Sequence, residues 1–133
     1  MKNIKNILAA STFTLFLASC GIDAPKKISV GEQCEHCKMS IENVKYATEL
    51  VTEKGRIYKF DDIKCMNGYV TSNADKVANA KTYVTDYPSE KLIEFEKATF
   101  IKGGSIKSPM GGNMQAYESK EEAEKAKKEF GVE

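Results

Sequence analysis

The stretch KYATELVTEKGRIYKFDDIKCMNGYV, residues 45–70, decides how the first half of the chain folds. Its segments 45–51 and 56–60 are rich in β-branched and aromatic side chains, which favour extended backbone. Gly55 lies between them in a three-residue Glu-Lys-Gly turn. Two such segments joined by a short glycine-containing turn predict a β-hairpin.

A short helix is predicted directly after the hairpin. Asp61 can cap its N-terminus, because an aspartate side chain accepts a hydrogen bond from a free backbone N–H of the first turn. Gly68 lowers the helix propensity, so we expect the helix to be short. Helical spacing places three apolar residues on one face, namely Ile63, Met66 and Val70.

The second half of the chain predicts further strands and a loop. Residues 74–80 favour a helical turn, and residues 82–87 (TYVTDY) favour a strand that Pro88 stops. Residues 92–103 contain one or two strands. Residues 105–117 (SIKSPMGGNMQAY) are glycine-rich and are expected to form a loop.

The C-terminal segment SKEEAEKAKKEFG, residues 119–131, is the clearest helix in the sequence. Ser119 and Glu122 form a capping box, and Gly131 is a typical C-terminal stop. A narrow apolar stripe consists of Ala123, Ala126 and Phe130. Favourable charge pairs at a spacing of four residues are Glu121 with Lys125 and Glu124 with Lys128.

Both halves of the chain share an order of elements. The first half predicts a hairpin, then Phe60-Asp61, then a helix; the second half predicts strands, then Tyr117-Glu118, then a helix. This weak echo predicts an α+β fold of two ββα-like units packed together, with small antiparallel sheets and helices. Two packed units bury more apolar surface than either unit buries alone.

The N-terminus has the features of a bacterial lipoprotein signal. Lys2 and Lys5 precede a short apolar run, residues 7–17, and small residues precede Cys20 in the sequence Leu-Ala-Ser-Cys. The run is too short for a transmembrane helix. We expect cleavage before Cys20 and a lipid on its thiol, which would tether the protein to a membrane on the non-cytoplasmic side. The alternative is an ordinary signal peptide with an incidental cysteine.

The sequence therefore divides into three segments. They are a lipoprotein signal peptide (residues 1–19), a lipidated cysteine with a flexible tether (residues 20–30) and one metal-binding domain (residues 31–133). Removal of residues 1–19 leaves 18 basic and 19 acidic residues. A nearly neutral chain without a basic patch argues against a nucleic-acid partner.

The number of cysteines indicates a ligand role for the thiols. Once Cys20 carries a lipid, three cysteines remain, and an odd number cannot be fully paired within an exported chain. Either one thiol stays free beside a disulfide, or the thiols hold a ligand. An oxidising compartment disfavours idle thiols and so favours the second possibility. The three cysteines are Cys34, Cys37 and Cys65.

The segment CEHCKM, residues 34–39, gathers two cysteines, a histidine and a methionine. Thiolate and thioether ligands select Cu(I) or a similarly soft ion. Cys34 and Cys37 have the spacing at which a turn brings two thiolates to one metal. Met39 follows Cys37 by two residues, so both sulfurs would face the same side of an extended segment. The candidate metal ligands are Cys34, Cys37, Met39, Cys65, Met110 and Met114, with His36 and Met66 as secondary candidates.

Other interpretations of the same residues remain open. Met66 fits the buried face of its helix, Cys65 can be a small buried hydrophobic residue, and Cys34 can form a disulfide with Cys37. A closed zinc site would use Cys34, Cys37, Cys65 and His36. A thiol–disulfide enzyme would need its Cys-x-x-Cys motif to open a helix, whereas the residues after Cys37 favour extended backbone.

Six pieces of the sequence occur in the order typical of a known family. They are LASC, the C-x-x-C-x-M of CEHCKM, KFDDIKCM, YVTDY, KLIEFEKATFIKGGS and the PMGG-to-QAY stretch before the last helix. These pieces cover nearly all of the chain after the signal. The sequence resembles the NosL family, lipoproteins known as nitrous oxide reductase accessory proteins.

The resemblance implies two ββα-like units similar to part of organomercurial lyase, and a binding protein rather than an enzyme. It implies a Cu(I) carrier in the cell envelope, lipid-anchored to a membrane and facing the periplasm, which supplies copper for the copper-sulfide centre of nitrous oxide reductase. The implied partner is a membrane complex of an ABC transporter with a periplasmic solenoid protein. The alternatives are a structural zinc-binding lipoprotein and a thiol–disulfide exchange lipoprotein.

The resemblance also implies roles for particular residues. Its C-x-M element falls on Cys37 and Met39. The family's glycine-flanked methionine falls on Met110, with Met114 as a rival. The remaining candidates, Cys34 and the Cys65-Met66 pair, match only part of the family.

Overall fold

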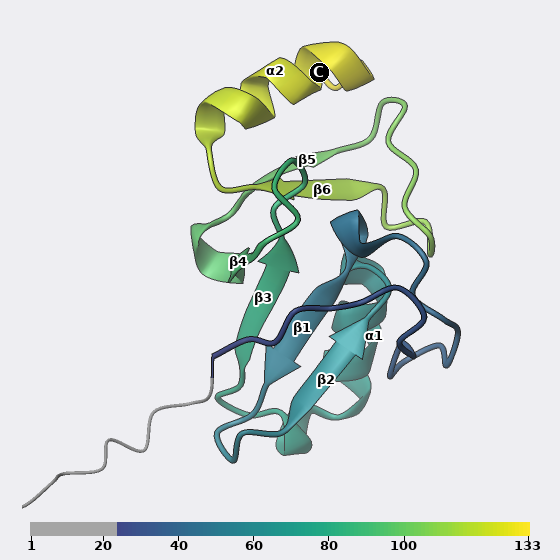
Figure 1. Ribbon diagram of the computed structural model, residues 1–133, viewed down its shortest axis with the longest axis vertical. Helices are drawn as coiled ribbons and strands as arrows, with labels where there is room; N and C mark the ends of the chain where they lie inside the picture. Colours follow the sequence, from purple (N-terminus) through teal and green to yellow (C-terminus); the bar gives the residue numbers. More distant parts are fainter. Residues whose placement is uncertain (1–23) are drawn as a thin grey trace, which may run out of the picture.

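The computed structural model describes residues 24–133, which form a four-stranded sheet, a two-stranded sheet and two α-helices (Figure 1). The signal peptide predicted at residues 1–19 and the lipid predicted on Cys20 lie outside the described residues. Within the described part of the chain, no helix is long and apolar enough to cross a membrane.

The larger sheet is antiparallel and has the strand order β2-β1-β3-β4. Its strands are β1 (Thr48–Val51), β2 (Ile57–Phe60), β3 (Lys81–Thr85) and β4 (Leu92–Glu94). The predicted hairpin is confirmed as β1 and β2. The strand predicted at residues 82–87 and the first strand of residues 92–103 are β3 and β4, and both extend the hairpin's sheet.

Side chains of this sheet alternate between two faces, as strand geometry requires. Leu50, Tyr58 and Phe60 lie in the main hydrophobic core with helix α1 (Ile63–Ser72). The ring of Tyr69 on α1 contacts both aromatic rings of β2, at centroid distances of 5.0 and 5.3 Å. The core therefore lies between the sheet and α1, which Figure 1 shows behind the strands.

The chain before the first strand crosses the sheet in front of β1 and β2 (Figure 1). We call residues 24–32 the N-terminal strap. The Lys26 N–H donates a hydrogen bond to Glu49 Oε1 on β1 (2.8 Å). Ile28 is 4% exposed and belongs to the main core. The packed part of the domain therefore begins before residue 31, the predicted domain boundary.

Helix α1 begins after Asp62. The Asp62 side chain accepts a hydrogen bond from the Cys65 N–H (3.1 Å) and is the N-cap. The prediction that Asp61 caps this helix is wrong, because the capping residue is the one immediately before the first helical turn. Met66 lies in the core, where helical spacing predicted an apolar face.

The smaller sheet pairs β5 (Thr99–Lys102) with β6 (Met114–Tyr117), and α2 (Lys120–Phe130) packs on it. The prediction that residues 105–117 form a loop is therefore wrong for their last four residues, which pair with β5. Ser119 caps α2, and Gly131 ends the helix in the left-handed conformation, both as predicted. Short 3-10 turns occur at Val44–Tyr46, Ala74–Lys76 and Phe95–Lys97.

The apolar stripe of α2 is confirmed. Ala123 and Ala126 are buried, and Phe130 packs against the same hydrophobic cluster. The predicted charge pairs are wrong: among residues 24–133 neither Glu121 with Lys125 nor Glu124 with Lys128 forms an ion pair, and Glu124 pairs with Lys127 instead (2.8 Å). Packing on the small sheet, rather than charge pairing alone, therefore stabilises this helix.

The two ββα units meet near the end of β3 and along β6. Asp86 forms a parallel bridge with Ala116, and its carboxylate accepts a hydrogen bond from the Glu118 N–H (2.8 Å). Ala116 forms a small buried cluster with Ile63 and Val84 at this junction. The predicted α+β fold of two ββα-like units is thus confirmed, with β3 and β4 added to the first sheet.

Candidate metal centre

The segment 34–39 forms a tight loop closed by backbone hydrogen bonds. Gln33 and Ser40 pair as an antiparallel bridge at its base. Inside the loop, the Lys38 N–H donates to the Cys34 carbonyl (3.0 Å). This turn brings the two cysteines of the motif onto one side of the loop.

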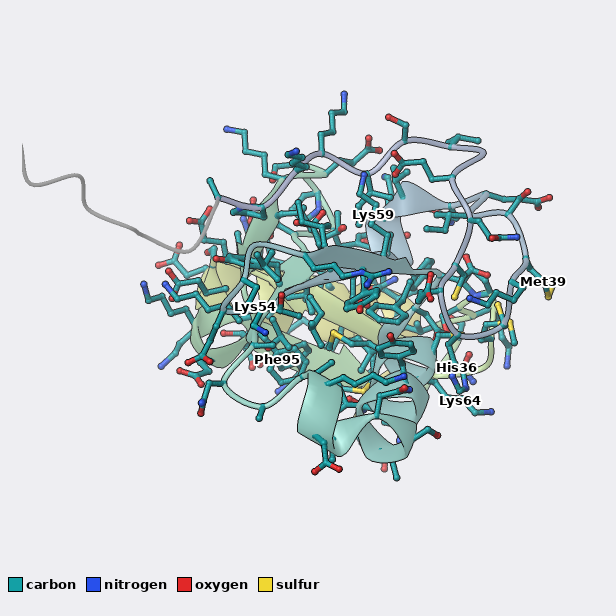
Figure 2. All side chains as sticks on the ribbon, turned by 90° about the horizontal axis from the view of Figure 1, so that it is seen from below. His36, Met39, Lys54, Lys59, Lys64 and Phe95 are labelled. Carbon is teal, nitrogen blue, oxygen red and sulfur yellow. The ribbon has the colours of Figure 1, made fainter. Side chains whose placement is uncertain are left out.

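The backbone between Cys37 and Met39 is not extended. Lys38 has a φ of 63°, in the left-handed region. The prediction that an extended segment directs both neighbouring sulfurs to one side is therefore wrong. Cys37 is half-buried against the core, whereas the Met39 side chain is 56% exposed. Figure 2 shows Met39 at the edge of the molecule.

Three thiols gather beneath this loop. The sulfur atoms of Cys34, Cys37 and Cys65 all lie within 4.8 Å of one another, and all three thiols are free. Cys65 is buried in the first turn of α1. The loop is held beside β2 by a hydrogen bond from the Glu35 N–H to the Lys59 carbonyl (2.8 Å). Residues from two distant parts of the sequence thus form one cluster.

The three thiols differ in proton affinity. Burial raises the pKa of Cys34, but the backbone N–H groups of Cys37, Asp61 and His36 outweigh it and bring the pKa below its ordinary value. Burial and the neighbouring Cys34 raise the pKa of Cys37. Burial and both other thiols raise the pKa of Cys65 strongly. Cys34 is therefore the most acidic of the three thiols, and a bound cation would favour deprotonation of the others.

The carboxylate of Asp62 joins this cluster to the glycine-rich loop, residues 108–113. One oxygen, Oδ1, caps α1. The other, Oδ2, accepts hydrogen bonds from Ser108 Oγ (2.7 Å), the Met110 N–H (3.2 Å) and the Gly112 N–H (3.2 Å). A Cβ at position 112 would lie 3.1 Å from Oδ2, so glycine permits the loop to close on the carboxylate.

The candidate methionines fall in different places. Met110 is half-buried and packs against the hydrophobic cluster that contains Cys34, Cys65 and Met66. Met66 is 2% exposed within that cluster. Met114 lies on β6 and packs against the junction cluster instead. The structure therefore brings Met110 and Met66 into the same cluster as the thiols and places Met114 outside it.

His36 is exposed, and its ring lies against α1. A Cβ at Gly68 would come within 2.7 Å of His36 Nε2, so the ring occupies the space that glycine leaves. Figure 2 labels His36, whose ring lies against the space beside Gly68. Among residues 24–133, no histidine or carboxylate belongs to the three-thiol group. The four-residue zinc set of three cysteines and His36 is thus not assembled in this arrangement.

The cluster is suited to a soft metal ion. An ion about 2.3 Å from each of three sulfurs, the usual zinc–sulfur distance, holds those sulfurs about 4 Å apart. The observed upper limit of 4.8 Å requires only small movements of the side chains. Thiolates select Cu(I), whereas a structural zinc ion normally takes four protein ligands. A thiol–disulfide enzyme would need its Cys-x-x-Cys motif to open a helix. The residues directly after Cys37 do not open an α-helix, because the next helical turn starts at Val44.

The chain is a small two-unit α+β domain with a cluster of three thiols, two buried and one half-buried, that could hold a metal ion. The NosL family model matches residues 25–132, and the chain belongs to the NosL family. The fold is similar to the crystal structure of the copper chaperone NosL from Shewanella denitrificans, with a TM-score of 0.68 and 19% sequence identity. That similarity covers 85% of this chain and 91% of the other. No curated protein shows a significant match.

Sequence reasoning missed the role of Asp62 in positioning the site. The sequence pattern places the helix cap at Asp61 and assigns no role to Asp62, so it predicts no link from Asp62 to a second segment. The available signal was the glycine-rich Pro-Met-Gly-Gly loop, because consecutive glycines leave backbone N–H groups free to approach a carboxylate. Its partner could not be identified, because Met110 lies 48 residues further along the chain.

Proposed function

We propose that this protein is a Cu(I)-binding metallochaperone of the periplasm, anchored to a membrane by a lipid on Cys20. The observation that carries the proposal is the cluster of three sulfur atoms within 4.8 Å of one another. Membership of the NosL family and the fold shared with a copper chaperone support it. Cu(I) is the cargo of this protein, and the function is binding and transfer rather than catalysis.

The sulfur-containing residues have different roles in holding and releasing the ion. Cys34, Cys37 and Cys65 hold Cu(I) as thiolates, which bind soft cations more strongly than oxygen or nitrogen ligands do. Met110, which packs against the hydrophobic cluster that contains Cys34 and Cys65, adds a thioether in this proposal. The exposed Met39 is available to an approaching partner. Transfer then proceeds by exchange of one sulfur ligand at a time, without free copper.

The client and partners follow from the family. We infer that the protein supplies copper for assembly of the copper-sulfide centre of nitrous oxide reductase, together with an ABC transporter and a periplasmic solenoid protein. The lipid anchor would confine donor and acceptor to one surface and thereby raise their effective concentration.

The function is tested by an anaerobic competition titration. The chain that begins at Gly21, kept reduced, would be titrated with Cu(I) and with Zn(II) against chromophoric chelators of known affinity. We expect one Cu(I) to bind far more tightly than Zn(II). Cys37→Ser should weaken Cu(I) binding more than about 100-fold, since loss of an outer-shell partner alone costs 10–100-fold.

The methionines provide a matched control. Met110→Leu should weaken Cu(I) binding, whereas Met114→Leu should leave it unchanged, because of these two methionines Met110 packs against the hydrophobic cluster that contains the thiols and Met114 does not. A preference for Zn(II), with loss of folded structure on chelation, would identify a structural zinc protein instead. A reversible disulfide between Cys34 and Cys37 with reductase activity and no metal would identify a thiol–disulfide enzyme.

A further inference from the structure

A recess of about 630 Å³ opens beside the cysteine loop. It is lined by the loop and the residues that follow it, and on the other side by residues that precede Met110. The lining residues are Met39, Ser40, Glu42, Asn43, Asp61, Lys107, Ser108 and Pro109. The recess is separate from the three-thiol cluster, but Met39 borders it and is continuous with the cysteine loop.

Asp61 in this recess is a buried carboxylate that lacks a partner. Asp61 is only 2% exposed, and among residues 24–133 its Oδ1 has no hydrogen-bond partner. The adjacent Asp62, by contrast, has both oxygens occupied by hydrogen bonds. An unpaired buried carboxylate is unfavourable unless a donor or cation reaches it. This asymmetry indicates that Asp61 receives a partner from outside the chain.

The charges around Asp61 favour a cation. The carboxylates of Asp62 and Glu42 act on it as like charges. Lys107 also lines the recess, but among residues 24–133 it forms no salt bridge, and the four that occur there involve other residues. A positively charged group that entered the recess would face two carboxylates, Asp61 and Glu42, at once.

The recess is directly connected to the metal-binding loop. Asp61 directly precedes Asp62, which caps the helical turn that carries Cys65. The Met39 side chain, 56% exposed, offers an apolar contact on the same wall. A group bound in the recess would therefore bring its own protein surface against the loop from which copper must leave.

We propose that this recess receives an arginine side chain of the protein that accepts copper. A guanidinium group is planar, weakly hydrated and able to bind two carboxylate oxygens at once, so it suits a partly buried acidic recess better than a lysine ammonium does. Its flat face and methylene stem also suit contact with Met39. The identity of the partner rests on the proposed function, whereas binding of a guanidinium group to the recess does not.

The test uses N-acetyl-arginine amide as the probe and its neutral isostere N-acetyl-citrulline amide as the control. Full-length, reduced, metal-free protein with ¹³C-labelled methionine methyl groups would be titrated in mild detergent at constant ionic strength. We expect the arginine probe to shift the Met39 methyl signal saturably and the citrulline probe to leave it in place. The Met114 methyl group, outside the recess, should not respond to either probe.

Variants assign the binding to the acidic wall. Asp61→Asn and, separately, Glu42→Gln should each weaken the arginine probe roughly tenfold, the scale of a charge-assisted hydrogen bond. Glu53→Gln, on the exposed hairpin turn, should have no effect. Equal shifts with both probes, or unchanged affinity in Asp61→Asn and Glu42→Gln, would overturn the proposal. Binding that appears only in Lys107→Gln would also overturn it, because the chain's own lysine would then fill the recess.

The two proposals fail independently. The probe titration is made without metal, so absence of Cu(I) binding in the competition titration would reject the copper function and leave the arginine site standing. Tight Cu(I) binding with no response to the arginine probe would reject the recess and leave the copper function standing.

Discussion

Gly68 shows how one absent side chain shapes the metal centre. Glycine inside a helix costs roughly 1 kcal/mol relative to alanine, and Gly68 lies in the middle of α1. The His36 ring occupies the space where a Cβ would be. The glycine therefore lets the cysteine loop lie directly on the helix that carries Cys65.

Substitution Gly68→Ala should separate stability from metal affinity. The free energy of unfolding should change by less than about 1 kcal/mol, because gained helix propensity offsets displacement of an exposed histidine. Cu(I) affinity should fall roughly tenfold, as for other outer-shell changes. Denaturant unfolding and the competition titration measure the two effects. The double variant His36→Ala/Gly68→Ala should recover the affinity; no recovery would show that His36 does not transmit the change.

For single residues, the sequence predicted which side chains gather at the metal centre better than it predicted how they are oriented. The odd number of cysteines indicated ligation, and Cys34, Cys37 and Cys65 do come together. The direction of Met39 could not be predicted, because a left-handed conformation at Lys38 has no signal in a lysine. Assigning one of two adjacent aspartates to the helix cap likewise depends on backbone angles that composition does not determine.

Among the elements, the N-terminal strap covers a buried carboxylate. Glu49 on β1 is fully buried beneath it, and within the described part of the chain its Oε2 has no hydrogen-bond partner. Lys59 on β2 holds the strap from the other side through an ion pair with Glu32 (2.8 Å) and a hydrogen bond to the Lys27 carbonyl (3.2 Å). The strap is thus fixed by a few polar contacts around one buried carboxylate.

Glu49→Gln should flatten the dependence of stability on pH. Burial raises the pKa of Glu49, so its contribution to stability is fully present below the unfolded value of about 4.3 and is lost as pH rises through the higher folded value. We expect the variant to lose less stability than the wild type between pH 4 and 8, measured by denaturant unfolding. Glu53→Gln should behave like the wild type. A steeper loss in Glu49→Gln would contradict this assignment.

The strands β1 to β5 and helix α2 could be predicted from local patterns, because turns, caps and the apolar stripe are local signals. Strand β6 could not, because it follows a glycine-rich segment that is typical of a loop. The strap could not, since residues 24–32 show no strand or helix periodicity and Ile28 is their main apolar anchor. The pairing of β3 with β1 also could not be predicted from the sequence, because strand pairing across 30 residues depends on which hydrophobic faces meet.

For the whole molecule, two aspartates, one at the start of α1 and one just after β3, hold segments of the second ββα unit. Asp62 holds the loop 108–113, and Asp86 holds the backbone after β6 through Glu118. Only the first connection borders the thiol cluster. The weak echo between the halves predicted that two units pack together. It predicted neither aspartate contact, because Asp62 and Asp86 hold different residues and the contacts are not repeated between the halves.

Asp62→Asn and Asp86→Asn form a matched pair that tests this division. Asparagine retains the helix cap at position 62, but its amide nitrogen cannot accept the bonds from the glycine-rich loop. Each variant should lose about 1–3 kcal/mol of stability through unsatisfied donors. Cu(I) affinity should fall 10–100-fold only in Asp62→Asn. Thermal unfolding and the competition titration measure both effects; equal copper affinities would show that the loop around Met110 is not coupled to the thiols.

Because the N-terminal strap is fixed to the sheet, it also limits the distance between the domain and a lipid on Cys20. Its first fixed contact, at Lys26, comes only six residues after Cys20. Six residues span at most about 20 Å when fully extended. With a lipid on Cys20, the whole domain would stay within a thin layer above the bilayer, and copper could pass only to a protein that is itself held at, or descends to, that same membrane surface.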